Sequence, residues 1–230
     1  MDTIEAIILG IVQGLTEFLP VSSSGHLQIA KALMGVEIEQ NLLFDVTLHA
    51  ATVLSTIVVL WSEVARLLRG LFSRRFNEEQ AYVLKLLLSM IPIGIVGFTL
   101  KDRLDALLES PAILLVVGCM LLVTAALLAF AYYAKPRQKA QLSYRDAFLI
   151  GVAQAVAALP GLSRSGSTIA TGLLLGNRKQ TVAQFSFLMV LAPILGETFL
   201  ELMKGNLGAQ AIGSAPLAAG FVAACLWGVW

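Results

Sequence analysis

Charged residues are scarce in this chain. Asp, Glu, Lys and Arg make up 13% of the 230 residues, whereas 57% are hydrophobic and the mean hydropathy is +0.81. These values lie outside those of soluble domains, and several apolar runs approach the length that crosses a bilayer. The formal net charge of +1 gives no bias toward nucleic acid. The composition therefore predicts an integral membrane protein without a nucleic-acid partner.

Cysteine is also rare: Cys119 and Cys225 are the two thiols, and both lie inside apolar runs. A thiol in such surroundings behaves as a small hydrophobe, so a disulfide or a cysteine metal site is not expected. The N-terminus lacks the basic region and the small-residue cleavage site of a signal peptide. The first apolar run is therefore expected to stay in the mature protein.

Five apolar runs, 42–61, 82–100, 111–133, 182–203 and 215–230, are candidates for full membrane spans. Segments 4–19 and 144–159 are shorter than the roughly 20 residues that a span needs. Each runs into Pro, Ser and Gly and then into another short helical stretch, 26–34 or 168–175. Non-helical backbone at membrane depth is tolerated only where protein or a water-filled cavity covers it. We therefore expect an all-α polytopic bundle containing two re-entrant broken-helix hairpins.

The two interrupted segments correspond to each other at a constant separation of 141 residues. The matched pairs are Gly10 with Gly151, Gln13 with Gln154, Ser22 with Ser163, Ser24 with Ser165, Gly25 with Gly166, and Phe44 with Phe185. A constant offset indicates internal duplication, which predicts a site at the interface between the repeats. The chain is then one membrane domain, 1–230, with repeat one at about 1–134 and repeat two at about 142–230, shortened at its C-terminus.

Basic residues predict how the repeats are oriented. Lys and Arg cluster in the loops that follow positions 61 and 133, so both loops are expected in the cytoplasm. Segment 36–41 has no basic residue, and the remaining loop holds only Lys101 and Arg103, which assigns both to the outside. Three spans, an odd number, separate the hairpins. The two copies should therefore form an inverted repeat, with the first hairpin entering from outside and the second from the cytoplasm.

The first polar loop contains groups suited to phosphate chemistry. Gln13 and Glu17 share a helix face, and a carboxylate in an apolar run is costly unless it is paired or faces water. The run from Ser22 to His26 (SSSGH) then opens a helix, whose N–H groups and dipole suit a phosphate. Serine capping and a snorkelling carboxylate are the plainer alternatives. Asp45 and His49, four residues apart, could equally snorkel or line a cavity.

The second polar loop contributes an arginine. Arg164 stands at the position of Ser23 in the first copy, between Ser163 and Ser165. A buried guanidinium needs an anion and is suited to bidentate phosphate binding. We expect the two loops to meet near the midplane and combine Glu, Ser and His with a phosphate clamp. A salt bridge between Arg164 and Glu17 is the plainer alternative.

These motifs resemble the BacA-type undecaprenyl-diphosphate phosphatases of bacteria. The run 13–26 (QGLTEFLPVSSSGH) is similar to the family's Glu/Gln-x-x-x-Glu and Ser-Ser-x-Gly-His elements, and 160–166 (PGLSRSG) to its Pro-Gly-x-Ser-Arg-Ser-Gly element. The resemblance implies hydrolysis of the polyprenyl diphosphate lipid undecaprenyl diphosphate. That reaction recycles the carrier for peptidoglycan synthesis and confers bacitracin resistance. It also implies the bacterial inner membrane, a periplasmic opening, a divalent cation and a possible homodimer.

The resemblance and the residue chemistry together assign roles. We expect Glu17, Ser22, Ser23, His26 and Arg164 to be catalytic. Binding of substrate is assigned to Gln13, Ser24, Gly25, Ser163, Ser165 and Gly166. Ser23 is the expected nucleophile, with Ser22 or a water activated by His26 or Glu17 as alternatives. Glu17 is expected to hold Mg²⁺ or Ca²⁺.

Other functions remain open at this point. Broken helices in inverted repeats are also a transporter architecture, so a lipid flippase or an ion-coupled transporter is the main alternative. Ser24-Gly25-His26 echoes the phosphatidic-acid-type lipid phosphatases, but no histidine follows Arg164. A purely structural module gives no reason to keep Glu17 and Arg164 at membrane depth.

Overall fold

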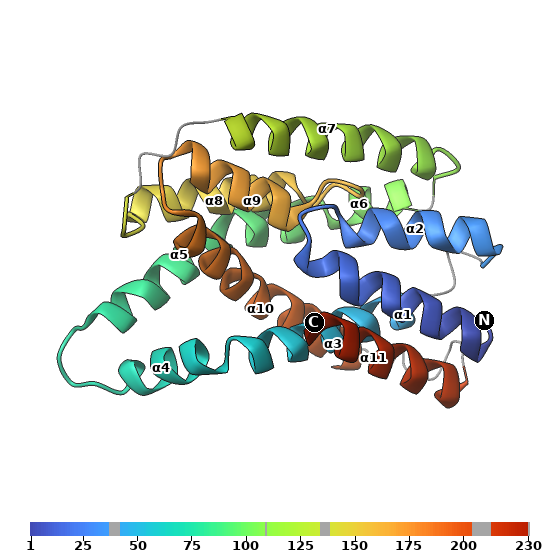
Figure 1. Cartoon of the computed structure of the whole chain (residues 1–230), viewed down its shortest axis with the longest axis horizontal. Helices are drawn as coiled ribbons and strands as arrows, with labels where there is room; N and C mark the ends of the chain where they lie inside the picture. The colour runs from blue at the N-terminus through green and yellow to red at the C-terminus, as the bar shows by residue number, and fades with distance from the viewer. Residues whose placement is uncertain (37–41, 109, 134–138, 204–212, 230) are drawn as a thin grey trace.

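The computed structural model describes residues 1–36, 42–108, 110–133, 139–203 and 213–229, and this part of the chain is helical without a β-strand (Figure 1). The helices are α1 (Thr3–Phe18), α2 (Ser23–Met34), α3 (Leu42–Val59), α4 (Trp61–Leu71), α5 (Glu78–Thr99), α6 (Lys101–Leu108), α7 (Ile113–Tyr133), α8 (Tyr144–Val156), α9 (Arg164–Leu174), α10 (Lys179–Met203) and α11 (Ser214–Val229). The predicted all-helical fold is confirmed.

Both short helices after the polar loops begin earlier than predicted. α2 begins at Ser23 rather than at position 26, and α9 begins at Arg164 rather than at 168. The cause is serine capping: the side chains of Ser22 and Ser163 each accept a hydrogen bond from the backbone N–H three residues further on, at 3.3 and 3.0 Å. The serine-rich runs are therefore first helical turns, and Arg164 projects from a helix N-terminus rather than from a loop.

Two segments predicted as loops are also helices. The basic residues after position 61 lie partly on α4, where Arg66 pairs with Glu63 at 2.7 Å and with Glu79 of α5 at 3.2 Å. Lys101 opens α6. The apolar residues between the basic ones recur at helical spacing, and this spacing makes α4 an amphipathic helix. The number of basic residues alone does not reveal it. Segment 37–41 and most of the loop after Tyr133 lie outside the described residues.

The described part of the chain contains fewer full-length apolar helices than the five spans predicted. On length and apolar composition, α5 and α7 can each cross a membrane. A third candidate is the pair α3 and α4, which bends by 79° at a break at Leu60. α10 covers the predicted segment 182–203, whereas α11 is a shorter apolar helix of 16 residues. Apolar helices of this length support a membrane protein.

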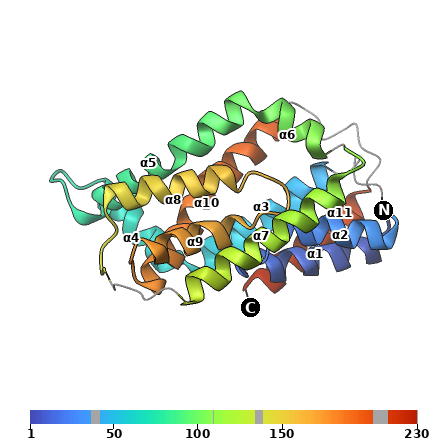
Figure 2. The same ribbon diagram turned by 90° about the horizontal axis from the view of Figure 1, so that it is seen from above.

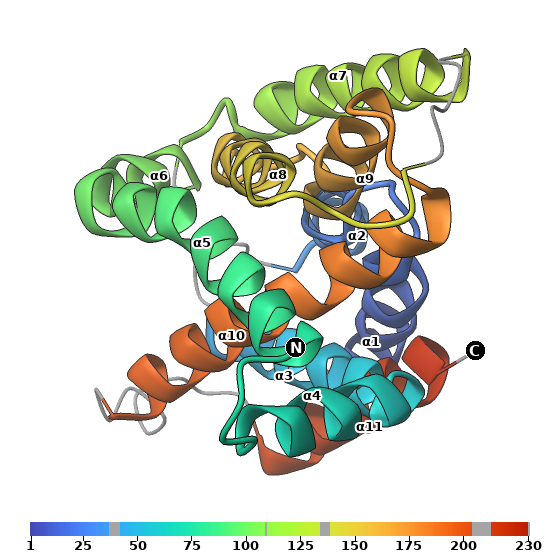
Figure 3. The same cartoon turned by 90° about the vertical axis from the view of Figure 1, so that its left-hand side faces the viewer.

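The two polar loops meet in the middle of the molecule. α1 and α2 approach from the end that holds the N-terminus, and α8 and α9 approach from the opposite end (Figures 1 and 2). Glycine allows the close approach: a Cβ on Gly25 would lie 3.3 Å from Gly161 Cα, and one on Gly166 would lie 3.1 Å from the Pro20 carbonyl oxygen. α10 crosses between the α7–α8–α9 side and the α3–α11 side (Figure 3).

Two buried clusters support the two hairpins, and they correspond position by position. The first includes Ala6, Leu9, Phe44 and Leu48, and the second includes Ala147, Ile150, Phe185 and Met189. Each residue of the second cluster in this list lies 141 positions after its counterpart in the first. The helix contacts also correspond, because α1 packs on α11 and α11 on α3, whereas α8 packs on α5 and α5 on α10. Equivalent residues therefore hold the two loops in place.

Candidate active site

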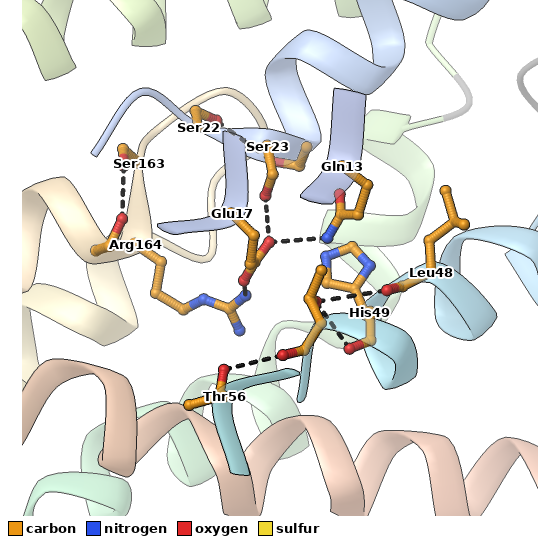
Figure 4. Close-up of polar contacts among 12 residues, drawn as sticks. Gln13, Glu17, Ser22, Ser23, Leu48, His49, Thr56, Ser163 and Arg164 are labelled. Atoms are coloured by element: carbon orange, nitrogen blue, oxygen red, sulfur yellow. Dashed lines mark hydrogen bonds and ion pairs between the residues drawn. The ribbon is translucent and has the colours of Figure 1, made fainter. Parts of the chain in front are cut away.

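Glu17, in the last turn of α1, is the centre of a hydrogen-bond network that joins the two loops (Figure 4). Its Oε2 accepts from Gln13 Nε2 at 2.9 Å and from Ser23 Oγ at 2.5 Å. Its Oε1 accepts from Arg164 Nη2 at 3.1 Å. The Glu17 side chain is 11% exposed and that of Arg164 27%. The structure thus contains the salt bridge between the loops, with the Ser23 hydroxyl bound to the same carboxylate.

The backbone of Ser22, which precedes α2, forms a strained turn. Its φ of 69° makes it the single non-glycine residue with positive φ among those described. Its Oγ lies 3.4 Å from Ser24 Oγ, and its carbonyl oxygen lies 2.8 Å from His26 Nδ1. A backbone conformation of this kind costs of order 1–3 kcal/mol and persists where surrounding contacts impose it. The turn at Ser22 directs the next residue, Ser23, toward Glu17.

A cavity of about 380 Å³ opens beside the network. Its walls include pairs of residues that occupy the same position in the two copies. These pairs are Glu17 with Ala158, Ser22 with Ser163, Ser23 with Arg164, Ser24 with Ser165, Asp45 with Ser186, and His49 with Val190. One wall is therefore acidic and carries an imidazole, whereas the opposite wall is neutral apart from Arg164. The cavity therefore has two chemically different sides.

Four of the predicted site residues do not line this cavity. Gln13 is fully buried and orients Glu17 from behind, and His26 contacts the Ser22 carbonyl. The N–H groups of Gly25 and Gly166 donate to the capping serines, so they are not free to bind phosphate oxygens. The other predicted residues do line it. These are Glu17, Ser22, Ser23, Ser24, Ser163, Arg164 and Ser165.

Asp45 and His49, whose position the sequence left open, both line the cavity. His49 Nδ1 lies 2.8 Å from the Asp45 carbonyl oxygen, and Figure 4 shows the ring directed toward Gln13 and Glu17. The Asp45 carboxylate accepts from the fully buried Lys31 Nζ through both oxygens at 2.7 Å. This ion pair was not predicted from the sequence. A lysine in an apolar segment needs a counter-ion, and that requirement is the signal that could have revealed it.

The ligand set for a cation is small. In the described part of the chain, no three or more His, Cys, Asp or Glu side chains lie together as a metal site. Glu17 is the one carboxylate of the network, since Gln13 supplies an amide at the first motif position. Mg²⁺ is commonly held by one or two carboxylates together with substrate phosphates. The residues present therefore fit a cation that arrives with a phosphorylated ligand better than an all-protein site.

Apolar helices that bring a carboxylate, serine hydroxyls and a guanidinium together at one cavity define the class, a helical membrane protein with a site suited to phosphoryl chemistry. The family model described as bacitracin resistance protein BacA matches residues 6–230. The chain belongs to the BacA family.

Curated relatives match over nearly the whole chain. A protein named undecaprenyl-diphosphatase from Parabacteroides distasonis is 62% identical, over 99% of this chain and 86% of the relative. Its namesake from Bacteroides fragilis is 59% identical over the same shares. A more distant relative with that name, from Methanosphaera stadtmanae, is 35% identical over 99% of this chain and 86% of its own length.

Proposed function

We propose that this protein is an undecaprenyl-diphosphatase, which hydrolyses undecaprenyl diphosphate to undecaprenyl phosphate and inorganic phosphate. The names of relatives 56–62% identical over nearly the full chain support this activity. The single observation that carries the chemistry is the contact of Ser23 Oγ with the Glu17 carboxylate, which itself pairs with Arg164 beside the cavity. The reaction recycles the lipid carrier for peptidoglycan synthesis and confers bacitracin resistance.

Ser23 is the nucleophile in this mechanism. As its Oγ attacks the terminal phosphorus, Glu17 Oε2, 2.5 Å away, accepts the hydroxyl proton. The bond from that phosphorus to the bridging oxygen breaks, and undecaprenyl phosphate leaves with the bridging oxygen. Water then attacks the phosphoseryl group, and the bond between phosphorus and Ser23 Oγ breaks. Oγ regains its proton from Glu17, and inorganic phosphate departs with the oxygen and the protons of the water. Glu17 thus serves as the direct base for Ser23.

Arg164 stabilises the charge that develops on the phosphoryl oxygens. A guanidinium carries five N–H donors in a rigid fork, so it can hold Glu17 and phosphate oxygens together. The hydroxyls of Ser24, Ser163 and Ser165 lie on the same cavity and are further donors. His26 acts here on the turn: its contact with the Ser22 carbonyl keeps that strained residue, and with it Ser23, in place.

The proposal includes a divalent cation and a membrane arrangement. Glu17 would hold Mg²⁺ or Ca²⁺, which would neutralise charge on the diphosphate. The approach of the two hairpins from opposite ends, and the correspondence of the two buried clusters, support an inverted repeat with re-entrant loops. We place the protein in the bacterial inner membrane as a multi-pass protein that opens to the periplasm. A homodimer stays a prediction.

The test is release of inorganic phosphate from undecaprenyl diphosphate by the purified protein in detergent. We expect Ser23→Ala to lose at least about 10³-fold in rate, because the nucleophile is removed. Ser167→Ala is the matched control, since Ser167 is a buried serine of α9 that does not line the cavity. A chelator should lower the wild-type rate.

A wild-type protein that moves the lipid across proteoliposomes without releasing phosphate would establish the flippase instead. A Ser23→Ala protein with the wild-type rate would transfer the role of nucleophile to Ser22 or to water.

A further inference from the structure

Two buried polar side chains of the second copy line the cavity and have no hydrogen-bond partner within the described part of the chain. Gln154 of α8 is 1% exposed and Ser186 of α10 is 2% exposed, and both line the cavity. The unpartnered atoms are Gln154 Oε1, Gln154 Nε2 and Ser186 Oγ. Gln28 Oε1 of the first copy, on the same cavity, is also without a partner. Buried polar atoms in folded proteins almost always have a partner, so four such atoms at one cavity indicate a bound group.

Divergence between the two copies explains why Gln154 Nε2 has no acceptor, whereas the amide oxygen is without a partner in both Gln13 and Gln154. Gln154 corresponds to Gln13, whose amide donates to Glu17, but the position equivalent to Glu17 is Ala158. Ser186 likewise replaces Asp45 of the first copy. The second copy therefore has an amide and a hydroxyl but no carboxylate at these positions, so this wall does not repel an anion. The carboxylates of the first copy, Glu17 and Asp45, are each paired with a cation.

Gln154 and Ser186 both lie next to residues of one buried cluster. Ile150, one turn before Gln154, and Phe185, next to Ser186, are part of the same buried cluster. α8 is followed by α9, whose first residue, Arg164, lines the same cavity. The neutral wall thus combines two uncharged donors and one acceptor with a guanidinium.

We propose that Gln154 and Ser186 form a subsite for the terminal phosphate, which they retain as inorganic phosphate before it leaves. Gln154 Nε2 and Ser186 Oγ donate to phosphate oxygens, and Gln154 Oε1 accepts from a P–OH group. Inorganic phosphate carries at least one P–OH near neutral pH, whereas the phosphate esterified to the lipid and bridged to its neighbour carries none. This assignment rests on the proposed function, because it names where the product of that reaction binds.

Binding of inorganic phosphate to the full-length protein in detergent tests the subsite without turnover. The dissociation constant follows from the rise in unfolding temperature with phosphate concentration. Ser186→Ala should weaken binding about tenfold, the effect of one lost hydrogen bond to a charged group. Gln154→Met should weaken it by more than that, because it removes both the Nε2 donor and the Oε1 acceptor. Ser167→Ala is the matched control: its hydroxyl is also buried and unpartnered, but it lies away from the cavity.

The stability of these variants supplies a second readout. Both serine variants remove an unpartnered buried hydroxyl, so without phosphate each should unfold at or above the wild-type temperature. Only Ser186→Ala should then lose phosphate affinity. An unchanged affinity for inorganic phosphate in both Ser186→Ala and Gln154→Met would overturn the subsite. The unpartnered atoms would then bind an ordered water or remain from the duplication without a function.

Turnover separates this proposal from the proposed function. If wild type hydrolyses undecaprenyl diphosphate but all variants bind phosphate equally, the subsite is wrong and the function stands. If the cavity variants lose phosphate affinity while wild type does not hydrolyse the lipid, the subsite stands and the function is wrong.

Discussion

Replacing Arg164 with methionine should destabilise the protein, because the guanidinium is the cation paired with Glu17. The Glu17 carboxylate is largely buried and would keep only the hydrogen bonds from Gln13 and Ser23. Removing one member of a buried ion pair costs about 3–5 kcal/mol. Since Arg164 is 27% exposed, we expect the lower end, about 3 kcal/mol. In a chain of 230 residues this lowers the unfolding temperature by about 6–12 °C.

Loss of the helical circular-dichroism signal on heating, in one detergent, measures this change. The double variant Arg164→Met with Glu17→Gln is the decisive comparison, because neutralising the carboxylate removes the unpaired charge. It should recover most of the lost stability although it remains inactive. An Arg164→Met protein that unfolds within about 2 °C of wild type, or a double variant no more stable than the single one, would refute the reasoning.

Two further predictions concern packing and the second ion pair. Gly151→Ala should destabilise the protein by about 1–3 kcal/mol, because the new Cβ would lie 2.3 Å from the Ser89 carbonyl oxygen of α5. Gly94→Ala should instead stabilise it by about 0.5–1 kcal/mol, because the new Cβ would meet no atom within 4 Å. Equal unfolding temperatures for the two variants would contradict this prediction. Asp45→Asn should lower the unfolding temperature more than Lys31→Met does. It leaves the fully buried Lys31 unpaired, whereas Lys31→Met leaves an Asp45 side chain that is 24% exposed and can still reach water. The reverse order in the same assay would show that the lysine is hydrated.

Local patterns predicted most of the helices and the duplication behind them. The apolar run 4–19 became α1 with a shift of one residue, since its composition and the polar residues at both ends define its limits. The starts of α2 and α9 were predicted too late because the serine runs were interpreted as loops. Side-chain capping by Ser22 and Ser163, which only a folded helix start satisfies, moved both boundaries.

The candidate site was predicted in part. Glu17, the serines and Arg164 stood out because charged or repeated polar residues in apolar segments need a partner. For the two histidines, the sequence assigned a catalytic role to His26 and left the place of His49 open. His26 and His49 each place Nδ1 2.8 Å from the carbonyl oxygen four residues earlier, so their local chemistry is the same. α3 packs against α1 and places His49 on the cavity, whereas His26 contacts the Ser22 carbonyl and does not line it.

Sequence alone determined the membrane character, the two copies and their offset, because composition, helix periodicity and residue identity are properties of the chain itself. Tertiary structure alone decided that Arg164 reaches Glu17 across 147 positions. It also decided that Gln154 and Ser186 face the cavity without a partner. Which side chains meet depends on how the helices cross, and neither the crossing nor the cavity it leaves is encoded in any one segment.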